Sequence, residues 1–180
     1  SDGSSYDGEL KDGKRHGFGT YHFASGAEYE GQWEDNKKNG FGTYYFSDNS
    51  GYKGDWKDNK KNGIGTYYYP DNSRYDGRWE DDEKNGIGTY YYPDNSRYEG
   101  EWKDDKSHGI GTYYYPDNSR YEGEWKDDRE NGRGIIYYNN KTSNFIKSMG
   151  QFKNGKMYGV GRKIQKDCKI YVGDWDKNNS

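Results

Sequence analysis

Tyr98-Glu-Gly-Glu-Trp102, followed seven residues later by Gly109-Ile-Gly-Thr-Tyr113, is one copy of a phrase that recurs along this chain of 180 residues. The copies begin at Tyr6, Tyr29, Tyr52, Tyr75, Tyr98 and Tyr121, so that each starts 23 residues after the previous one. A strict period of this size is typical of repeat proteins, in which each repeat is one small structural unit. The sequence therefore predicts a repeat architecture.

Each repeat predicts a pair of β-strands. Large or small residues alternate with charged ones from Tyr98 to Trp102, which places both aromatic side chains on one face of a strand. Residues 103–108 form a polar stretch that predicts a loop, and residues 109–115 alternate again as a second strand. The following Pro116-Asp-Asn-Ser119 has the residues of a tight turn.

Neighbouring repeats are expected to continue one antiparallel sheet. A glycine such as Gly100 leaves a gap on the aromatic face, which a neighbouring aromatic ring can cover. The rings then pack on one another from repeat to repeat. The predicted fold is all-β: a single elongated antiparallel meander of β-hairpins, forming an open twisted ribbon or trough.

The composition agrees with a thin folded sheet. Hydrophobic residues make up 28% of the chain and charged residues 33%, which is typical of disordered proteins, but 19% of the residues are aromatic. Tyrosine and tryptophan bury a large surface and keep a polar tip. The single cysteine offers no internal disulfide, and no apolar run or signal peptide is recognisable, so we expect a cytoplasmic protein.

The pattern Tyr-Glu-Gly-Glu-Trp followed by Gly-x-Gly-Thr-Tyr at this spacing resembles the MORN repeat (membrane occupation and recognition nexus) over essentially the whole chain. The resemblance implies a meander of hairpins, often with a concave aromatic groove. It also implies roles in cytoskeletal scaffolds, ciliary assemblies and membrane junctions, or as a regulatory module of a larger enzyme such as a lipid kinase or a histone methyltransferase. The expected location is the cytoskeleton or the cytoplasmic face of membranes.

The regular pattern changes near the C-terminus. Residues 1–140 contain six regular repeats, whereas residues 141–180 contain the end of an insertion, a degenerate seventh repeat and a truncated eighth. The distance from Tyr121 to Met149 is 28 residues, and Met149-Gly-Gln-Phe152 replaces Tyr-x-Gly-x-Trp. We interpret the chain as a segment of a longer array or protein. The irregular end is either the drift of a terminal repeat or a surface for binding.

The sequence favours no enzyme. Its three histidines are scattered, no Ser/His/Asp or Cys/His arrangement is suggested, and Gly-x-Gly lacks the context of a nucleotide site. No cofactor or metal site is predicted, and the paired acids of loops such as residues 34–37 and 103–106 are interpreted as solvated tips. Nucleic acid is disfavoured because residues 1–140 carry a net charge of −9.

The preferred function is a scaffold that receives a peptide or helix of a partner protein in its aromatic groove. The candidate face consists of Tyr29, Trp33, Tyr52, Trp56, Tyr75, Trp79, Tyr98, Trp102, Tyr121 and Trp125. Such rings are typical binding anchors. The inner rings can instead have a structural role, in which they pack on one another and hold the sheet together. Four tyrosines are expected to be more exposed and available to a ligand: Tyr44, Tyr67, Tyr90 and Tyr113.

The C-terminal end suggests two further partners. Residues 141–180 carry nine Lys or Arg against three Asp, so this end is basic while the rest is acidic. The alternative function is therefore the binding of phosphoinositides or another anionic phospholipid surface. Its candidate residues are Lys147, Lys153, Lys156, Arg162, Lys163, Lys166 and Lys169. The same asymmetry allows a homodimer through the C-terminal repeats, although lysines also deter pairing at a sheet edge.

Overall fold

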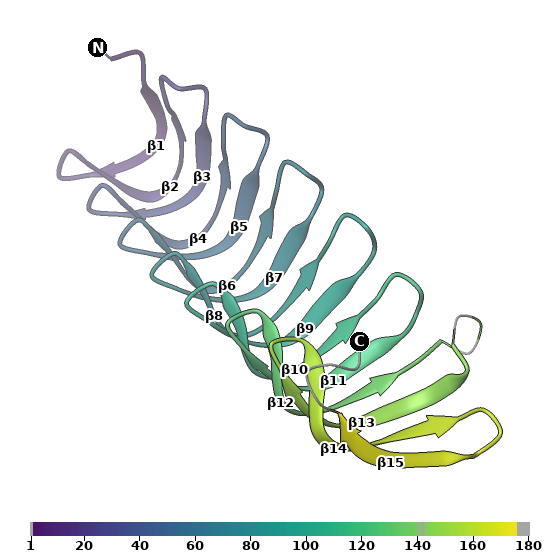
Figure 1. Ribbon diagram of the computed structural model, residues 1–180. Coiled ribbons are helices and arrows are strands. Elements are labelled where there is room, and N and C mark those ends of the chain that lie inside the picture. Colours follow the sequence, from purple (N-terminus) through teal and green to yellow (C-terminus); the bar gives the residue numbers. More distant parts are fainter. Residues whose placement is uncertain (1, 140, 142, 176–180) are drawn as a thin grey trace. The chain divides into compact units, whose positions relative to one another are not determined.

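The protein is built from antiparallel strands in the computed structural model, which describes residues 2–139, 141 and 143–175 (Figure 1). No helix occurs among these residues. The hydrogen-bonded order of the strands follows the chain from β1 to β15, which confirms the predicted meander. The strands are β1 (Ser5–Lys11), β2 (Lys14–His22), β3 (Glu28–Glu34), β4 (Lys37–Tyr45), β5 (Gly51–Lys57), β6 (Lys60–Tyr68), β7 (Arg74–Glu80), β8 (Glu83–Tyr91), β9 (Arg97–Lys103), β10 (Lys106–Tyr114), β11 (Arg120–Lys126), β12 (Arg129–Tyr137), β13 (Phe145–Lys153), β14 (Lys156–Gln165) and β15 (Ile170–Trp175).

The chain divides into two compact units, residues 1–90 and 91–180, and the division falls inside β8. In the first unit, β1 to β6 each pair with the next strand of the chain. In the second unit, β9 to β15 pair in the same way. Figure 1 shows the strands of each unit as curved ribs joined by turns at both edges of the sheet.

The turn inside each repeat is shorter than the sequence suggested. The prediction of a loop over residues 103–108 is wrong, because β9 continues to Lys103 and β10 begins at Lys106. Only Asp104 and Asp105 connect the strands, with φ values of 49° and 66°. Two consecutive residues with positive φ are characteristic of a type I′ hairpin, whose twist matches that of the strands. Aspartate adopts this conformation more readily than most residues.

The turn between repeats has the predicted chemistry. In the Pro70-Asp-Asn-Ser73 segment, Asn72 has a φ of 67°, and Tyr69 N donates to Ser73 O at 3.0 Å. Asp71 Oδ1 accepts hydrogen bonds from Ser73 N at 2.9 Å and from Ser73 Oγ at 2.6 Å. These bonds hold the pKa of the exposed Asp71 carboxyl below its usual value. The side chain thus satisfies the backbone of the turn that it occupies.

A tyrosine lying over two glycines forms the core of each regular repeat. Gly54 of β5 and Gly65 of β6 are directly opposite each other, and the ring of Tyr52 covers both. A Cβ atom on Gly54 would lie 2.6 Å from Tyr52 Oη and 2.6 Å from Ile64 O. The Tyr52 hydroxyl donates to Asp55 O at 3.0 Å, and the residue is completely buried. Glycine is therefore required because the ring occupies the place of two side chains.

Tryptophans join each core to the next. The ring of Tyr52 lies edge-on to Trp56 of its own repeat at 5.0 Å and to Trp79 of the following repeat at 5.4 Å. Trp79 Nε1 donates to Gly65 O at 3.1 Å, so its polar atom is satisfied in the buried position. Such edge-to-face contacts are favourable for aromatic rings. The interior of the sheet is thus a chain of rings that continues from repeat to repeat.

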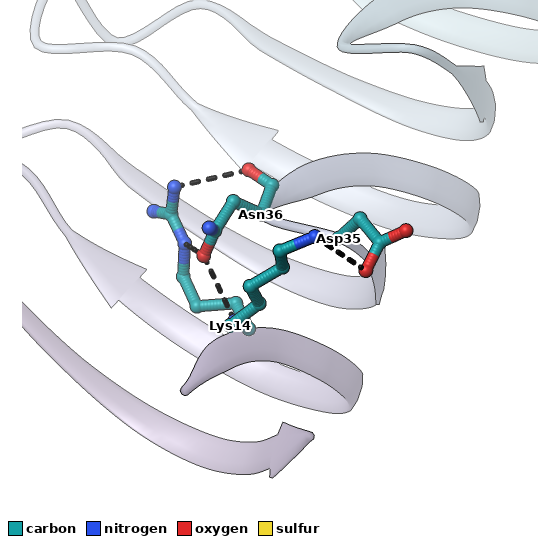
Figure 2. Close-up of polar contacts among 4 residues, drawn as sticks. Lys14, Asp35 and Asn36 are labelled. Carbon is teal, nitrogen blue, oxygen red and sulfur yellow. Dashed lines mark hydrogen bonds and ion pairs between the residues drawn. The ribbon is translucent and has the colours of Figure 1, made fainter. Parts of the chain in front are cut away.

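The hairpin turns also bind one another along the edge of the first unit. Figure 2 shows Lys14, Asp35 and Asn36 at this edge. Asn36 N donates to Arg15 O at 3.0 Å, and Asn36 Oδ1 accepts from Arg15 N at 2.9 Å. Asn59 and Asp82 repeat this pair of bonds in the first unit, and Asp128 does so in the second. The tip residues 34–37 and 103–106 are exposed, as the sequence predicted. The prediction missed that the second turn residue, such as Asn36, also binds the backbone of the preceding hairpin.

The seventh repeat has a different register from the one that its sequence suggested. Gly150 of β13 pairs with Gly134 of β12, just as Gly123 pairs with Gly111 in the preceding repeat. Ser148 therefore occupies the place of the buried tyrosine and is completely buried, whereas Met149 lies on the opposite face. The assignment of Met149 to the tyrosine position is wrong by one residue, because the insertion before it conceals the alignment.

A methionine compensates for the missing ring in this repeat. The Cε atom of Met157 lies 3.1 Å from the position that a Cβ on Gly150 would take. Methionine adapts to irregular gaps in a core because its side chain is unbranched and flexible. The hydroxyls of Ser148 and Tyr138 lie 3.0 Å apart and form a hydrogen bond. The position is thus filled and satisfied without tyrosine.

The substitution Gly54→Ala is expected to lower the free energy of unfolding by about 1–3 kcal/mol, because the added methyl group collides with backbone and with the Tyr52 hydroxyl. Urea unfolding followed by tryptophan fluorescence measures this change. Gly51→Ala is the control, because its Cβ would be 3.5 Å from the nearest neighbouring atom, Tyr44 O. Equal stability of the two variants would contradict the role of the glycine pair.

Asn59→Gly is expected to be less stable than Asp58→Gly by about 1 kcal/mol in the same urea experiment. Both changes place glycine at a residue with positive φ in one turn, but only Asn59 accepts a hydrogen bond from Lys38 N, at 2.8 Å. Asp58 makes only an exposed ion pair with Lys37, which contributes little to stability. A less stable Asp58→Gly would refute the inter-hairpin role of Asn59.

Candidate functional site

The predicted binding rings are mostly interior. The five tyrosines at the repeat starts, from Tyr29 to Tyr121, are 0–1% exposed, and the five tryptophans from Trp33 to Trp125 are 4–9% exposed. Their surfaces are in contact with glycines and with each other. The structure thus assigns these ten rings to the core, where they support the more exposed side chains of the same face.

A second set of rings is half-buried on the same face. Tyr44, Tyr67 and Tyr90 belong to it in the first unit, and Tyr113 is the equivalent residue in the second unit. The contacts include Tyr44–Phe46 at 4.4 Å, Phe46–Tyr67 at 5.8 Å and Tyr67–Tyr69 at 4.5 Å between ring centroids. We call the continuous set in the first unit the aromatic row: Tyr21, Phe23, Tyr44, Phe46, Tyr67, Tyr69 and Tyr90.

The sequence analysis missed part of this row. Phe23, Phe46 and Tyr69 follow the second strand of their repeats. The predicted second strand included the equivalent residue, Tyr115, but these positions were not named as candidates for binding. Their signal in the sequence is an aromatic residue two positions after each outer tyrosine, at the same 23-residue spacing. Alternation along an extended chain places these two positions on the same face.

Cations lie beside the aromatic row in every repeat of the first unit. Lys38 Nζ is 3.9 Å from the centroid of Trp56 and 4.5 Å from that of Tyr44. Lys61 Nζ is 4.0 Å from the centroid of Trp79 and 4.9 Å from that of Tyr67. Such contacts are favourable because a cation is attracted to the face of an aromatic ring. We call this set the basic row: Arg15, Lys38, Lys61 and Lys84.

The basic row was not predicted from the sequence. Its residues recur every 23 positions, but each has other charged residues beside it in the sequence. Only the register of the sheet shows which of these charged residues lie over the aromatic rings. Lys37, for example, pairs with Asp58 at the edge of the sheet, whereas Lys38 reaches over the rings. Burial lowers the pKa of Lys38 to about 8, a nearby Asp82 opposes this effect and Lys61 adds to it. Lys38 is thus a partly desolvated cation on the aromatic face.

The second unit carries different residues at the positions of the basic row. Ser107 and Glu130 replace the cations, and both are buried. Tyr115 Oη donates to Glu130 Oε1 at 2.7 Å. Burial raises the pKa of the Glu130 carboxyl, and the hydrogen bond from Tyr115 partly offsets this effect. The aromatic face is therefore basic in the first unit but not at these positions of the second.

The seven basic residues predicted to bind lipid do not share one surface. Lys147 and Arg162 lie on the face opposite the aromatic one, whereas Lys163 lies on the aromatic face, 5.4 Å from the centroid of Trp175. Lys153 and Lys156 flank one hairpin turn. Lys166 and Lys169 belong to the turn at the other edge of the sheet, where Lys169 pairs with Asp167 at 2.8 Å.

The opposite face exposes apolar residues that the sequence analysis did not consider for binding. They are the middle residues of Gly-x-Gly, and they are 50–71% exposed: Phe18, Phe41, Ile64, Ile87, Ile110 and Val160. The sequence does contain a sign of them: the middle residue of Gly-x-Gly is apolar in all these repeats, although strand alternation places it on the face away from the aromatic rings. In the seventh repeat Val160 lines a shallow hollow of about 520 Å³ together with Ile135 and Met149.

Comparison with known families decides the relationship of the chain. The MORN repeat pattern matches residues 6–28, 29–51, 52–74, 75–97, 98–120, 121–143 and 149–167. The chain belongs to the MORN repeat family. The seventh match begins at Met149, one residue after the serine that takes the tyrosine position in the structure.

Other comparisons give the fold only. No curated protein matches the chain in sequence. Among solved structures, the chain is similar to the TCP domain of SAS-4 (dCPAP) from Drosophila melanogaster, determined in complex with a proline-rich motif of Ana2 (dSTIL). The TM-score is 0.54 at 9% identity, and the similarity covers 88% of this chain and 84% of the other.

The described residues also bear on two other kinds of site. No helix there is long and apolar enough to cross a membrane. Within the same residues, no group of three or more His, Cys, Asp or Glu side chains is arranged to hold a metal ion.

Replacement of Glu130 by glutamine is expected to raise the melting temperature at pH 7.5. The pKa of Glu130 is raised in the folded state, so the folded protein favours the protonated carboxyl. The contribution of this group to folding stability is therefore lost as the pH rises through its folded-state pKa. Glutamine keeps an acceptor for Tyr115 without a charge. The advantage should shrink towards pH 4.5, the ordinary value for this group. Glu80→Gln, an exposed residue, controls for net charge, and a pH-independent difference would contradict the prediction.

Proposed function

We propose that this MORN-repeat chain is a non-catalytic scaffold that binds a segment of a partner protein on the aromatic face of its first unit. The observation that supports this function is the aromatic row, whose rings are half-buried and lie beside a cation in every repeat. A partner bound here would remove the remaining surface of these rings from water. Burial of apolar surface is the main driving force of protein association.

The residue types favour protein recognition. Tyrosine provides a large, rigid contact area with only two side-chain torsions, and it is frequent among the residues that dominate binding energies. Tyr67 is further fixed by a hydrogen bond from its hydroxyl to Ser50 Oγ, at 3.1 Å. Rings that are already held in place lose little conformational freedom on binding. The row is therefore suited to an interaction surface.

The fold neighbour supports the same class of function by analogy. The TCP domain of SAS-4, which has a similar fold, was determined with a proline-rich motif of another protein. A sheet of this kind can thus hold a peptide segment. The analogy concerns the type of partner, because a shared fold does not determine function.

The cellular location of the protein and its pairing with a second copy are further parts of the proposal. Assembly at the cytoskeleton or at the cytoplasmic face of a membrane rests on the resemblance to other MORN-repeat proteins. Pairing of two chains through the C-terminal repeats rests on the charge difference between the two ends of the sequence. Neither is needed for the binding of a partner segment by the first unit.

The test is an unbiased selection of random 16-residue peptides displayed on phage. Selected peptides are expected to bind the wild-type chain and to lose at least tenfold in affinity with Tyr67→Ala, while Tyr68→Ala leaves binding unchanged. The two tyrosines are adjacent, but Tyr67 is in the aromatic row whereas Tyr68 is on the opposite face and 51% exposed. Tyr69→Ala is a second variant of the row.

The melting temperature of each variant separates binding from folding. Loss of binding by a variant that melts as the wild type does supports the proposed face. The proposal fails if no peptide is enriched, or if the selected peptides are as sensitive to Tyr68→Ala as to the two substitutions in the row.

A further inference from the structure

We propose that the partner segment is an acidic, proline-rich stretch in the polyproline II conformation, which crosses the strands of the first unit and advances one turn per repeat. This inference rests on the proposed function and specifies its ligand. It follows from the spacing of the repeats, from the rings that they present and from the position of the basic row.

The binding positions of successive repeats lie along a line across the strands. Tyr44 pairs with Tyr52 on the neighbouring strand, and Tyr52 pairs in turn with Tyr67. Equivalent residues are therefore two strands apart without a shift in register. Neighbouring strands in a sheet are about 4.7–4.9 Å apart, so one repeat corresponds to about 9.4–9.8 Å.

Polyproline II has nearly the same period. It has three residues per turn and a rise of about 3.1 Å per residue, so that a turn advances about 9.3 Å. Residues i, i+3, i+6 and i+9 then lie on one side of the peptide, one for each repeat of the first unit. Over four repeats the two periods differ by only about 2 Å in total at most.

Other peptide conformations fit this spacing less well. An α-helix returns to the same side after about seven residues, or about 10.5 Å, and the mismatch accumulates to several ångströms over four repeats. A β-strand returns to the same side every two residues, or about 6.6–6.8 Å, which is not a divisor of the repeat. The periodicity of the sheet thus selects among the conformations of an elongated partner.

The aromatic row offers the surface that such a peptide requires. Polyproline II segments bind in grooves lined by aromatic rings, because proline presents a compact apolar ring and is already fixed in conformation. Tyr44 and Phe46 supply two rings in one repeat, and Tyr67 and Tyr69 supply two in the next. Each turn of the peptide can therefore place its prolines against an equivalent pair of rings.

The basic row determines the charge of the peptide. Lys38 Nζ lies 4.5 Å from the ring centroid of Tyr44, and Lys61 Nζ lies 4.9 Å from that of Tyr67. Each repeat thus combines a ring of the aromatic row with a cation. A peptide with Asp or Glu at every third residue presents one carboxylate per repeat, on the side where these cations stand. The complementary charge argues for an acidic segment and against a basic one.

The experiment compares labelled synthetic peptides of twelve residues by fluorescence anisotropy at physiological salt. Four Pro-Pro-Glu triplets are expected to bind in a saturable manner. Four Pro-Pro-Lys triplets test the sign of the charge, and four Gly-Ser-Glu triplets carry the same charge without the conformation. Three Pro-Pro-Pro-Glu quartets keep the prolines but change the spacing of the acids. Each of these three controls is expected to bind at least tenfold more weakly.

Paired variants of the protein test the location. The double substitution Lys38→Gln/Lys61→Gln removes two cations of the basic row and is expected to weaken the Pro-Pro-Glu peptide at least tenfold. Lys37→Gln/Lys60→Gln removes the same charge from the adjacent residues, which pair with Asp58 and Asp81 at the sheet edge. This control is expected to change affinity less than threefold. Melting temperatures confirm that both variants are folded.

Several results would overturn the inference. They are equal binding of the Gly-Ser-Glu or quartet peptides, equal effects of the two double variants, and absence of binding by the Pro-Pro-Glu peptide. Tighter binding of an acidic helical peptide, or a dimer in sedimentation that the Lys38→Gln/Lys61→Gln variant alone abolishes, would assign the face to a helix or to a second copy. The peptide selection on phage judges the proposed function separately, because it does not depend on the conformation or charge of the ligand.

Discussion

The packing of one tyrosine ring over two opposed glycines supports the rest of this structure. At Gly54 and Gly65 the ring of Tyr52 replaces two side chains, and its hydroxyl satisfies a backbone carbonyl of its own strand. The adjacent tryptophans bury the edges of that ring and donate to the carbonyl of the preceding repeat. No repeat completes its core alone, so stability depends on the contacts between neighbours. A single layer of strands thereby acquires an interior.

The rings of the repeats fall into two sets, one that forms the core and one that lies at the surface. The inner tyrosines and tryptophans are buried in the core, whereas the outer tyrosines, such as Tyr44 and Tyr67, are half-buried at the surface. Cations over these rings make the face of the first unit both aromatic and basic. In the second unit Ser107 and Glu130 replace these cations. The repeats thus share a scaffold while the two units present different chemistry.

The period of the sequence was sufficient for the strand order, the family and the face on which the rings gather. It was insufficient for details that depend on backbone conformation. Asp104 and Asp105 were interpreted as part of a longer loop, because the sequence does not reveal that both residues adopt positive φ. Ser148 was overlooked because the insertion removes the spacing by which the other repeats were aligned. The half-buried rings of the candidate site were partly predicted, at Tyr44 and Tyr67, but the lysines beside them were not.

The sequence by itself determined that the chain is a series of hairpins with a tyrosine, a glycine and a tryptophan on one face, because alternation and period are properties of the residues in order. Only the tertiary structure decided which rings are interior and which are available, and which of two adjacent lysines, Lys37 or Lys38, reaches over them. The physical reason is that exposure and charge depend on the neighbouring repeat, which lies 23 residues away in the chain but two strands away in space.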